Sequence, residues 1–168
     1  SRTMLGSEQF GWLTKKLSTS SARWNFIGNS VMISPVLIPP LDPEATKAVT
    51  QLLGLPEEGM PYNLDQWDGY AAERRRVTKY LLDNNIRNTV WLTGDIHSSW
   101  ACDIPAAPGT YPRGGVAGVE IVCTSVTSSN IDDILKLPED NALSHTVEYA
   151  FTNMNRHVKY LDFDSHGY

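Results

Sequence analysis

The stretch from Thr89 to Trp100 constrains the fold of this chain more than any other part of the sequence. Its first half is an apolar run rich in β-branched residues, which is typical of a buried strand, and the run stops at Gly94. Asp95 and His97 follow at once. Because ligands bind beyond the carboxyl ends of strands in open α/β sheets, the sequence predicts a buried strand that ends in a functional loop.

Asp95 and His97 are the candidate catalytic residues and metal ligands of that loop. A carboxylate and an imidazole together suit a hard or borderline divalent or trivalent ion. Gly94 would allow a close backbone turn beneath the ion, and side chains two positions apart point the same way if the backbone stays extended. The pattern is short, and residues directly after a strand often serve instead as caps or internally bonded polar groups.

The composition excludes several classes of protein. A chain of 168 residues with 41% hydrophobic content is large enough for one domain with its own core. Its net charge of −5 gives no sign of a nucleic-acid-binding surface. No apolar run approaches the ~20 residues that a membrane span requires, and the N-terminus lacks a basic and then apolar signal segment. We therefore expect a soluble globular chain.

The two cysteines, Cys102 and Cys123, leave the redox compartment open. Their spacing is too long for a Cys-x-x-Cys site, so they would either pair in an exported protein or remain thiols in a reducing compartment. Both lie in or beside apolar, strand-like stretches, which favours two buried thiols.

Helical and extended patterns alternate in the first part of the chain, as expected for an α/β fold. Ser7 is a candidate N-cap of an amphipathic helix with Phe10, Leu13 and Leu17 on one face. A strand-like run over residues 24–33 follows this helix.

Asn29 lies where that strand-like run is interrupted, and it would either deliver an amide oxygen to a site or occupy a turn. Residues 34–65 are rich in proline and predict a long loop or insertion within the domain, with room for one short helix that starts at Pro43. Loops of this length in compact domains are usually functional covers or mobile segments.

A second helical pattern follows the loop, with Trp67, Tyr70, Arg74, Val77 and Leu81 on one side. An arginine within an apolar stripe needs a carboxylate partner or an anionic ligand if it faces the interior. Tyr70 and Arg74 are therefore candidate substrate-binding residues, and core packing with an ion pair to an acidic residue is equally compatible with the pattern.

The remaining sequence predicts further strands and two more helices. The strands are expected over residues 100–104, 116–126 and 157–164. The first of them is expected to be a short edge strand. Glu120, in the middle of the second, is expected to be exposed. Asn130 and Ser144 are the expected N-caps of the two helices.

Several separated stretches resemble the PhoD-like alkaline phosphatase/phosphodiesterase family, a branch of the calcineurin-like metallophosphoesterases. They lie at residues 2–9, 12–13, 24–32, 65–70 with 74, 92–100, 119–120 with 124–125, 157–160 and 166–168. The set covers nearly the whole chain in collinear order. The ordered set is specific, whereas each fragment alone is not.

The resemblance implies a fold, an activity and cofactors. The fold is α/β, as part of a four-layer α/β/β/α sandwich with a metal cluster at the strand ends. The activity is metal-dependent hydrolysis of phosphate monoesters or diesters by in-line attack of metal-bound hydroxide. Calcium and iron are the implied ions, and export to the periplasm or the medium is implied as well. Asp95 and His97 match the late metal-ligand block of the family, and Asn29, Tyr70 and Arg74 would contact the phosphoester substrate.

The early metal-ligand blocks of the family precede Arg2 in family order and do not appear in this chain. Residues 1–168 therefore resemble the C-terminal portion of the catalytic domain, and two late ligands alone do not hold a dinuclear cluster. We expect the missing N-terminal half of the same domain to be a partner and the isolated chain to be inactive. The alternative is a non-catalytic α/β binding or assembly module with a degenerate metal site.

Half of such a sandwich would leave one face of its sheet uncovered. We therefore expect an exposed apolar surface, or a homodimer that forms through exposed sheet edges.

Overall fold

A computed structural model describes residues 2–38 and 63–168 of the chain. Most of the loop expected at 34–65, with the helix expected to start at Pro43, lies outside the described residues. The described elements are α1 (Gly6–Thr19), β1 (Asn25–Asn29), η1 (Trp67–Tyr70), α3 (Ala71–Asp83), β2 (Thr89–Thr93), β3 (Ser99–Pro105), η2 (Pro108–Thr110), β4 (Val116–Val122), α4 (Ile131–Leu135), α5 (Ala142–Met154) and β5 (Val158–Asp162). Among them, no helix has the length and apolar character that a membrane crossing requires.

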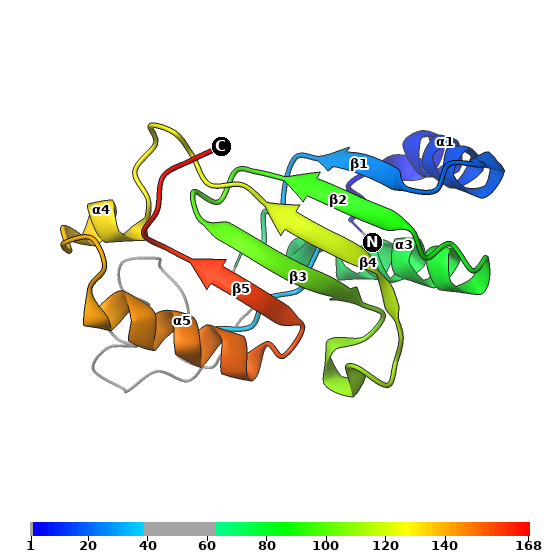
Figure 1. The fold of residues 1–168 in the computed structure, drawn as a ribbon. Helices are drawn as coiled ribbons and strands as arrows, with labels where there is room; N and C mark the ends of the chain where they lie inside the picture. Colours follow the sequence, from blue (N-terminus) through cyan, green and yellow to red (C-terminus); the bar gives the residue numbers. More distant parts are fainter. Residues whose placement is uncertain (1, 39–62) are drawn as a thin grey trace.

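The strands form one mixed, five-stranded sheet in the order β1-β2-β4-β3-β5 (Figure 1). β1, β2 and β4 run parallel, whereas β3 runs antiparallel to both of its neighbours, β4 and β5. The predicted α/β fold is confirmed. The expectation of an edge strand over residues 100–104 is wrong, because β3 lies between two other strands of the described sheet.

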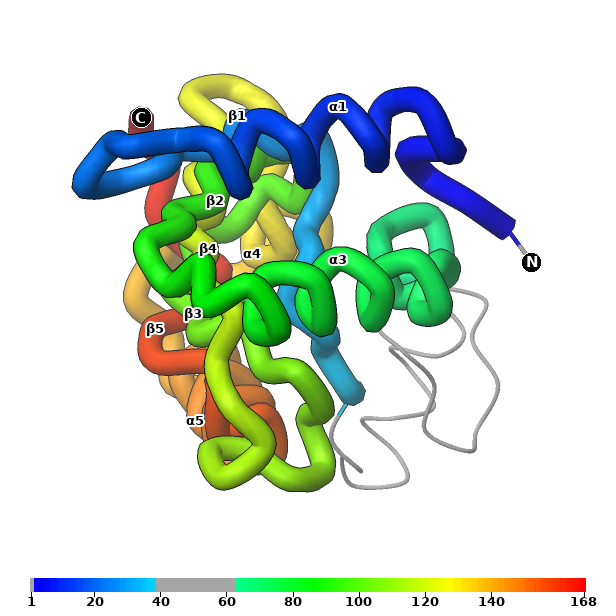
Figure 2. The backbone as a smooth tube through the Cα atoms, turned by 90° about the vertical axis from the view of Figure 1, so that its right-hand side faces the viewer, coloured from blue at the N-terminus to red at the C-terminus, as the bar shows by residue number. Residues whose placement is uncertain are grey.

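Helices α1 and α3 pack next to each other and form one hydrophobic core with the sheet (Figure 2). The predicted apolar face of α1 is buried in this core, together with Trp91 of β2. The rings of Phe10 in α1 and Tyr80 in α3 meet edge to face, with centroids 6.3 Å apart. Each large apolar side chain buried in this way stabilises the fold by about 1.5–3 kcal/mol, so this core fixes the two helices to the sheet.

A second core surrounds Trp100 of β3. Its indole meets the ring of Phe151 in α5 with centroids 6.2 Å apart, and the ring of Phe163 with centroids 5.7 Å apart. Because β3 pairs with both β4 and β5, this core holds α5 and the chain after β5 against the middle of the sheet.

The N-terminus of α1 is bonded differently from the expectation. Ser7 is not the N-cap, and no side chain caps the helix locally. Instead the buried Glu73 of α3 accepts hydrogen bonds from the backbone N–H groups of Met4 and Leu5, at 2.9 Å for Leu5. A carboxylate at a helix N-terminus also interacts favourably with the helix dipole, so Glu73 serves both helices.

The sequence predicts an N-cap for each of the last two helices, and the structure confirms one and corrects the other. Asn130 caps α4: its side chain accepts from the backbone N–H of Asp133 at 2.9 Å, and Asp133 bonds back to the Asn130 N–H. Ser144 lies inside the first turn of α5, and its N–H donates to Asn141 at 2.9 Å. Asn141 is the N-cap because it is the last residue in extended conformation before the helix.

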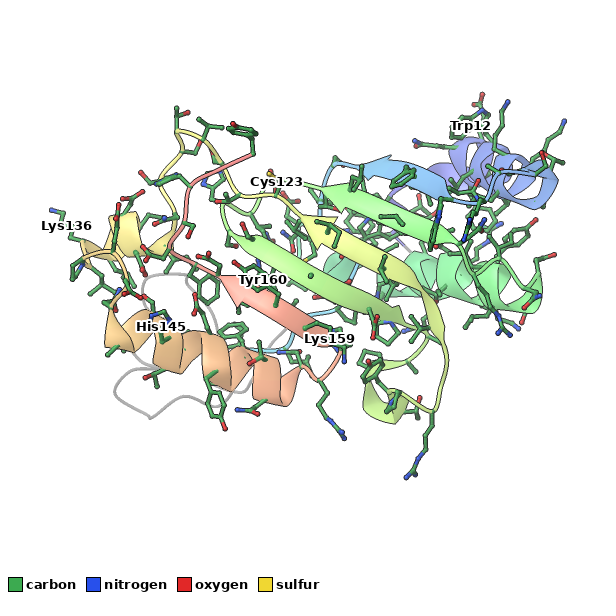
Figure 3. All side chains as sticks on the ribbon, viewed as in Figure 1. Trp12, Cys123, Lys136, His145, Lys159 and Tyr160 are labelled. Carbon is green, nitrogen blue, oxygen red and sulfur yellow. The ribbon has the colours of Figure 1, made fainter. Side chains whose placement is uncertain are left out.

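One face of the sheet is apolar, and none of the helices described in residues 2–38 and 63–168 lies across it (Figure 1). Its large exposed side chains are Phe26 (66% exposed), Leu92 (47%), Val119 (37%), Ile121 (45%) and Tyr160 (52%). They occupy adjoining register positions, because Leu92 pairs with Ile121 and both Ile121 and Tyr160 pair with Ala101. Tyr160 is labelled on β5 in Figure 3. The expected exposed apolar surface is therefore present, and we call it the open sheet face.

The imidazole of His157 is the group through which we expect the stability of the fold to depend on pH. It is buried, its Nε2 bonds the carbonyl of Pro35 at 2.6 Å, and burial lowers its pKa from the usual 6.5. A carbonyl only accepts, so the neutral ring with a proton on Nε2 satisfies this contact.

We predict that the free energy of unfolding falls as pH decreases from 6.5 towards the lowered pKa, because the unfolded chain takes up a proton that the folded chain resists. His157→Gln keeps an N–H for Pro35 but does not titrate, so this variant should show a shallower slope. Urea unfolding of both proteins between about pH 5 and 8 measures the difference. Equal slopes would contradict the assignment.

Candidate functional site

Four segments of the chain follow β1, β2, β4 and β5 at the edge of the sheet where these strands end (Figure 1). The last two segments are joined by hydrogen bonds. The Asn130 Nδ2 donates to the carbonyl of Asp164, and the Gly167 N–H donates to the carbonyl of Ser125 at 3.2 Å. This is the edge at which the sequence predicts a functional loop.

Gly94, Asp95 and Ile96 form a three-residue turn directly after β2. The Ile96 N–H donates to the Gly94 carbonyl at 3.1 Å, and Asp95 has a φ of 80°. Turns of this kind are rare, and the left-handed region is strained for a residue with a side chain. His97 also has a positive φ, of 53°. The backbone is therefore not extended from Asp95 to His97, so the condition under which the two side chains would point the same way is not met.

Burial alternates along this turn and fixes its direction. Ile96 packs against the core around Trp100, and Ser98 is 0% exposed and accepts a hydrogen bond from the Trp100 Nε1 at 2.8 Å. Asp95 and His97 are exposed. Two residues that face the core thus hold the strained backbone while the two candidate ligands project from the edge of the sheet.

The hydrogen bond of His97 determines which ring nitrogen is available. Its Nδ1 lies 2.9 Å from the carbonyl oxygen of Ser129, in the segment after β4. Because a carbonyl oxygen only accepts, Nδ1 carries the proton, and in the neutral ring Nε2 has a lone pair that no group within residues 2–38 and 63–168 engages. A histidine held this way by its second nitrogen is the usual form of a metal-ligating imidazole in proteins.

Asp95 and His97 together supply part of a metal site. Among residues 2–38 and 63–168, no hydrogen bond or ion pair engages the Asp95 carboxylate, and no group of three His, Cys, Asp or Glu side chains is arranged to hold a metal ion. A free carboxylate and a free imidazole nitrogen fit a hard or borderline cation. Two ligands are fewer than such an ion requires, so the described residues provide a partial donor set.

His166 ties the end of the chain to this edge. Its Nδ1 bonds the Ser125 carbonyl at 3.1 Å, and its Nε2 bonds the Asp133 carboxylate of α4 at 3.0 Å. The bond to the Ser125 carbonyl has the largest effect on the pKa of His166 and the bond to Asp133 the next largest. Both raise this pKa above 6.5. Because both partners accept, both bonds are satisfied when the imidazole is protonated.

Asn29, at the end of β1, is paired in register with Thr93 at the end of β2. Its Nδ2 donates to the Val31 carbonyl at 2.6 Å and to the Thr93 hydroxyl at 3.3 Å, and its Oδ1 accepts from the Trp67 Nε1 at 3.3 Å. The amide is therefore held in one orientation beside the strand that leads to Gly94. Oδ1 retains one lone pair.

Tyr70 and Arg74 come from η1 and α3 and are engaged within the chain. Arg74 forms an ion pair with Asp68, and the side chains are 13% and 9% exposed. Asp68 also accepts from the Val36 N–H at 3.0 Å, and the Tyr70 hydroxyl accepts from Arg2 at 3.2 Å. In the described parts of the chain, no hydrogen bond or ion pair joins Tyr70 or Arg74 to Asp95 or His97.

Two residues near the site differ from the sequence-based expectations. Glu120, expected to be exposed, is 0% exposed. Cys123, expected to be a buried thiol, is exposed at the end of β4 (Figure 3), whereas Cys102 is buried, and neither forms a disulfide. Their apolar neighbours gave no indication of this, because in this sheet apolar residues also face outward.

A cavity of about 200 Å³ lies between α1 and β1. Asn29, Ser30 and Trp67 line it, but Asp95 and His97 do not. Because the candidate ligands stand on the exposed turn after β2, we place the candidate site at the edge of the sheet rather than in this cavity.

Comparisons with known proteins agree with the family resemblance. A family model described as PhoD-like phosphatase matches residues 1–168. Alkaline phosphatase D of Bacillus subtilis (strain 168) is 30% identical over 153 residues, which make up 90% of this chain and 23% of that protein. A solved structure, "Structure of PhoD", matches 100% of this chain and 27% of its own with a TM-score of 0.70 and 27% identity.

The chain thus spans about a quarter of the length of both relatives. The match to the family model nevertheless extends over all 168 residues of this chain, and the structural match covers every element described above. The chain belongs to the PhoD-like phosphatase family.

Proposed function

We propose that this chain forms part of an enzyme for metal-assisted hydrolysis of phosphate monoesters or diesters, in which Asp95 and His97 are metal ligands. The observation that carries the proposal is the strained turn after β2. A left-handed conformation costs a residue with a side chain about 1–2 kcal/mol, and here it presents a carboxylate without a bonding partner among the described residues, next to an imidazole whose Nδ1 is held by the Ser129 carbonyl. Among the described residues, no hydrogen bond or ion pair accounts for the Asp95 carboxylate, and the bond of His97 to Ser129 leaves its Nε2 unengaged.

The residues of the chain have separate roles in this proposal. Asp95 would supply a carboxylate oxygen and His97 its Nε2 to an ion, for which calcium and iron are our expectation. A cation held there would lower the pKa of a bound water and would offset the negative charge of the phosphate. Asn29 would present the remaining lone pair of its Oδ1 to the bound substrate. Tyr70 and Arg74 stay predicted substrate contacts, and Arg74 would have to act from within its ion pair with Asp68.

The open sheet face supports a partner for this chain. Contiguous exposed apolar patches of this kind usually mark interaction surfaces. We propose that the N-terminal half of the same domain covers this face, completes the four-layer sandwich and brings the remaining metal ligands. A homodimer through sheet edges is the competing arrangement. Export of the protein also stays a prediction.

One observation favours a second function, a non-catalytic binding or assembly module. The described residues contain no complete metal-ligand group. The two functions differ in the role of Asp95 and His97. In the enzyme they bind a metal ion, whereas in a module without a metal the two exposed side chains on a strained turn would have no ligand.

We predict that the isolated chain does not hydrolyse bis(p-nitrophenyl) phosphate when calcium and ferric iron are supplied, because it provides only two ligands. Addition of the N-terminal half should restore hydrolysis, and the Asp95→Asn/His97→Ala double variant should not respond. Hydrolysis by the chain alone, lost in the double variant, would show that the ligand set is complete here. Absence of hydrolysis in every mixture, and in the full-length protein, would favour the non-catalytic module.

We predict that Asp95→Gly separates the backbone role of this residue from its chemical role. Glycine adopts a φ of 80° without strain, so the free energy of unfolding should stay equal or rise by up to about 1 kcal/mol. Phosphoester hydrolysis by the full-length protein should nevertheless fall by at least about 100-fold, because a ligand is lost.

Asp95→Asn is the matched control for this variant. Asparagine tolerates the left-handed region and keeps one acceptor oxygen, so its activity should lie between those of the wild type and the glycine variant. Full activity of Asp95→Gly would mean that Asp95 serves only the turn. Urea unfolding and initial rates on the same samples provide both measurements.

A further inference from the structure

The peptide group between Ser129 and Asn130 is hydrogen-bonded at both of its ends. Its carbonyl oxygen, which belongs to Ser129, lies 2.9 Å from the Nδ1 of His97. Its N–H, which belongs to Asn130, donates to the Oδ2 of Asp133 at 3.2 Å. The same Oδ2 lies 3.0 Å from the Nε2 of His166. Asp133 and His97 therefore bond opposite ends of one peptide group.

This peptide group carries direction from one of its ends to the other. It is planar and trans, so its N–H and its C=O point in opposite directions, and an acceptor that fixes the N–H also fixes the carbonyl. Within residues 2–38 and 63–168, Asp133 is the only acceptor bonded to this N–H, and His97 is the only donor bonded to this carbonyl. The direction of the Ser129 carbonyl thus depends on the carboxylate of Asp133.

Other hydrogen bonds hold the chain on either side of this peptide but leave its plane unfixed. The buried side chain of Asn130 accepts from the first turn of α4 and donates to the carbonyl of Asp164. On the other side, the Ser125 hydroxyl oxygen accepts from the Ser128 N–H at 2.9 Å. A peptide can rotate about the line between its two Cα atoms while both atoms stay in place, so these bonds do not decide where the Ser129 carbonyl points.

We propose that Asp133 is a positioning residue that acts through this peptide to keep the proton of His97 on Nδ1 and to leave its Nε2 for a metal ion. A carboxylate bonded to the N–H also polarises the peptide, which makes its carbonyl a stronger acceptor for the imidazole. Groups bonded to the second nitrogen of a ligating histidine fix its tautomer and its orientation. This role rests on the proposed function, because it assigns His97 to a metal ion.

Three variants of the full-length protein separate this role from a structural one. Asp133→Ala removes the acceptor for the Asn130 N–H. Asp133→Glu should keep it, because glutamate is the usual acidic residue at this position of a capping box. His166→Ala is the matched control, since it removes the other bond of the same Oδ2 and leaves the Asn130 N–H bonded. Circular dichroism checks that each variant folds.

The first measurement is the pair of ring ¹⁵N chemical shifts of His97 in histidine-labelled, metal-free protein at about pH 8, where imidazoles of ordinary pKa are neutral. His97→Ala identifies these signals by their loss. The wild type should show one protonated and one bare nitrogen. In Asp133→Ala both shifts should move towards the average of the two tautomers, whereas Asp133→Glu and His166→Ala should keep the wild-type values.

The second measurement is a titration with Co²⁺, a borderline cation whose visible absorption reports its ligands. Asp133→Ala should lower the affinity for Co²⁺ by about tenfold, as expected for the loss of a group that orients a ligand, and Asp133→Glu should restore it. His166→Ala should change it by less than about twofold. Because metal binding can drive folding, the titration also measures this affinity if the metal-free protein is unfolded.

Wild-type ring shifts in Asp133→Ala would overturn the positioning role, and so would equal losses of Co²⁺ affinity in Asp133→Ala and His166→Ala. Altered ring shifts with an unchanged affinity would also overturn it, since the orientation of His97 would then not serve metal binding. An affinity for Co²⁺ that is the same in the wild type and in His97→Ala would instead refute the proposed function, and the ring shifts would still show whether Asp133 orients His97.

Discussion

The buried Glu120 carboxylate of β4 accepts hydrogen bonds from the Thr93 hydroxyl of β2 and from the N–H groups of Ile33 and Ser34, which lie 87 and 86 residues away in sequence. A buried carboxylate costs several kcal/mol unless donors surround it, and the backbone N–H groups of Ile33 and Ser34 would themselves be unsatisfied in the interior. Each group therefore requires the others. The exit of the chain from β1 and the position of β2 beside β4 depend on this arrangement.

The elements with a strong local pattern are predictable from the sequence. The apolar face of α1, the strand that ends at Gly94 and the Asn130 cap of α4 are all present where the sequence places them. Each depends on neighbours within a few residues, such as side chains that recur once per helical turn or a polar side chain one turn from an N–H group. These signals fix the α/β class and the edge of the sheet that carries the candidate site.

The errors come from contacts that the local pattern does not contain. Alternation along β4 suggests that a carboxylate faces water, but here Val119 and Ile121 face outward on the open sheet face, and Glu120 faces the core. The N-terminus of α1 is bonded by Glu73, 68 residues away from Leu5. The strained turn at Asp95 likewise depends on the core contact of Ile96, which no spacing within Gly94 to His97 reveals.

The two cysteines differ in a way that makes the site accessible to spectroscopy. Cys102 is enclosed by the core around Trp100, and burial raises the pKa of its thiol, which keeps it protonated and unreactive. Cys123 is exposed, and its N–H is bonded to the carbonyl of Thr93, the residue before Gly94. Within the described residues, a thiol-directed fluorophore or spin label would therefore attach at one place only. That place adjoins the turn that carries Asp95, so the native chain already contains a reporter position for events at this edge.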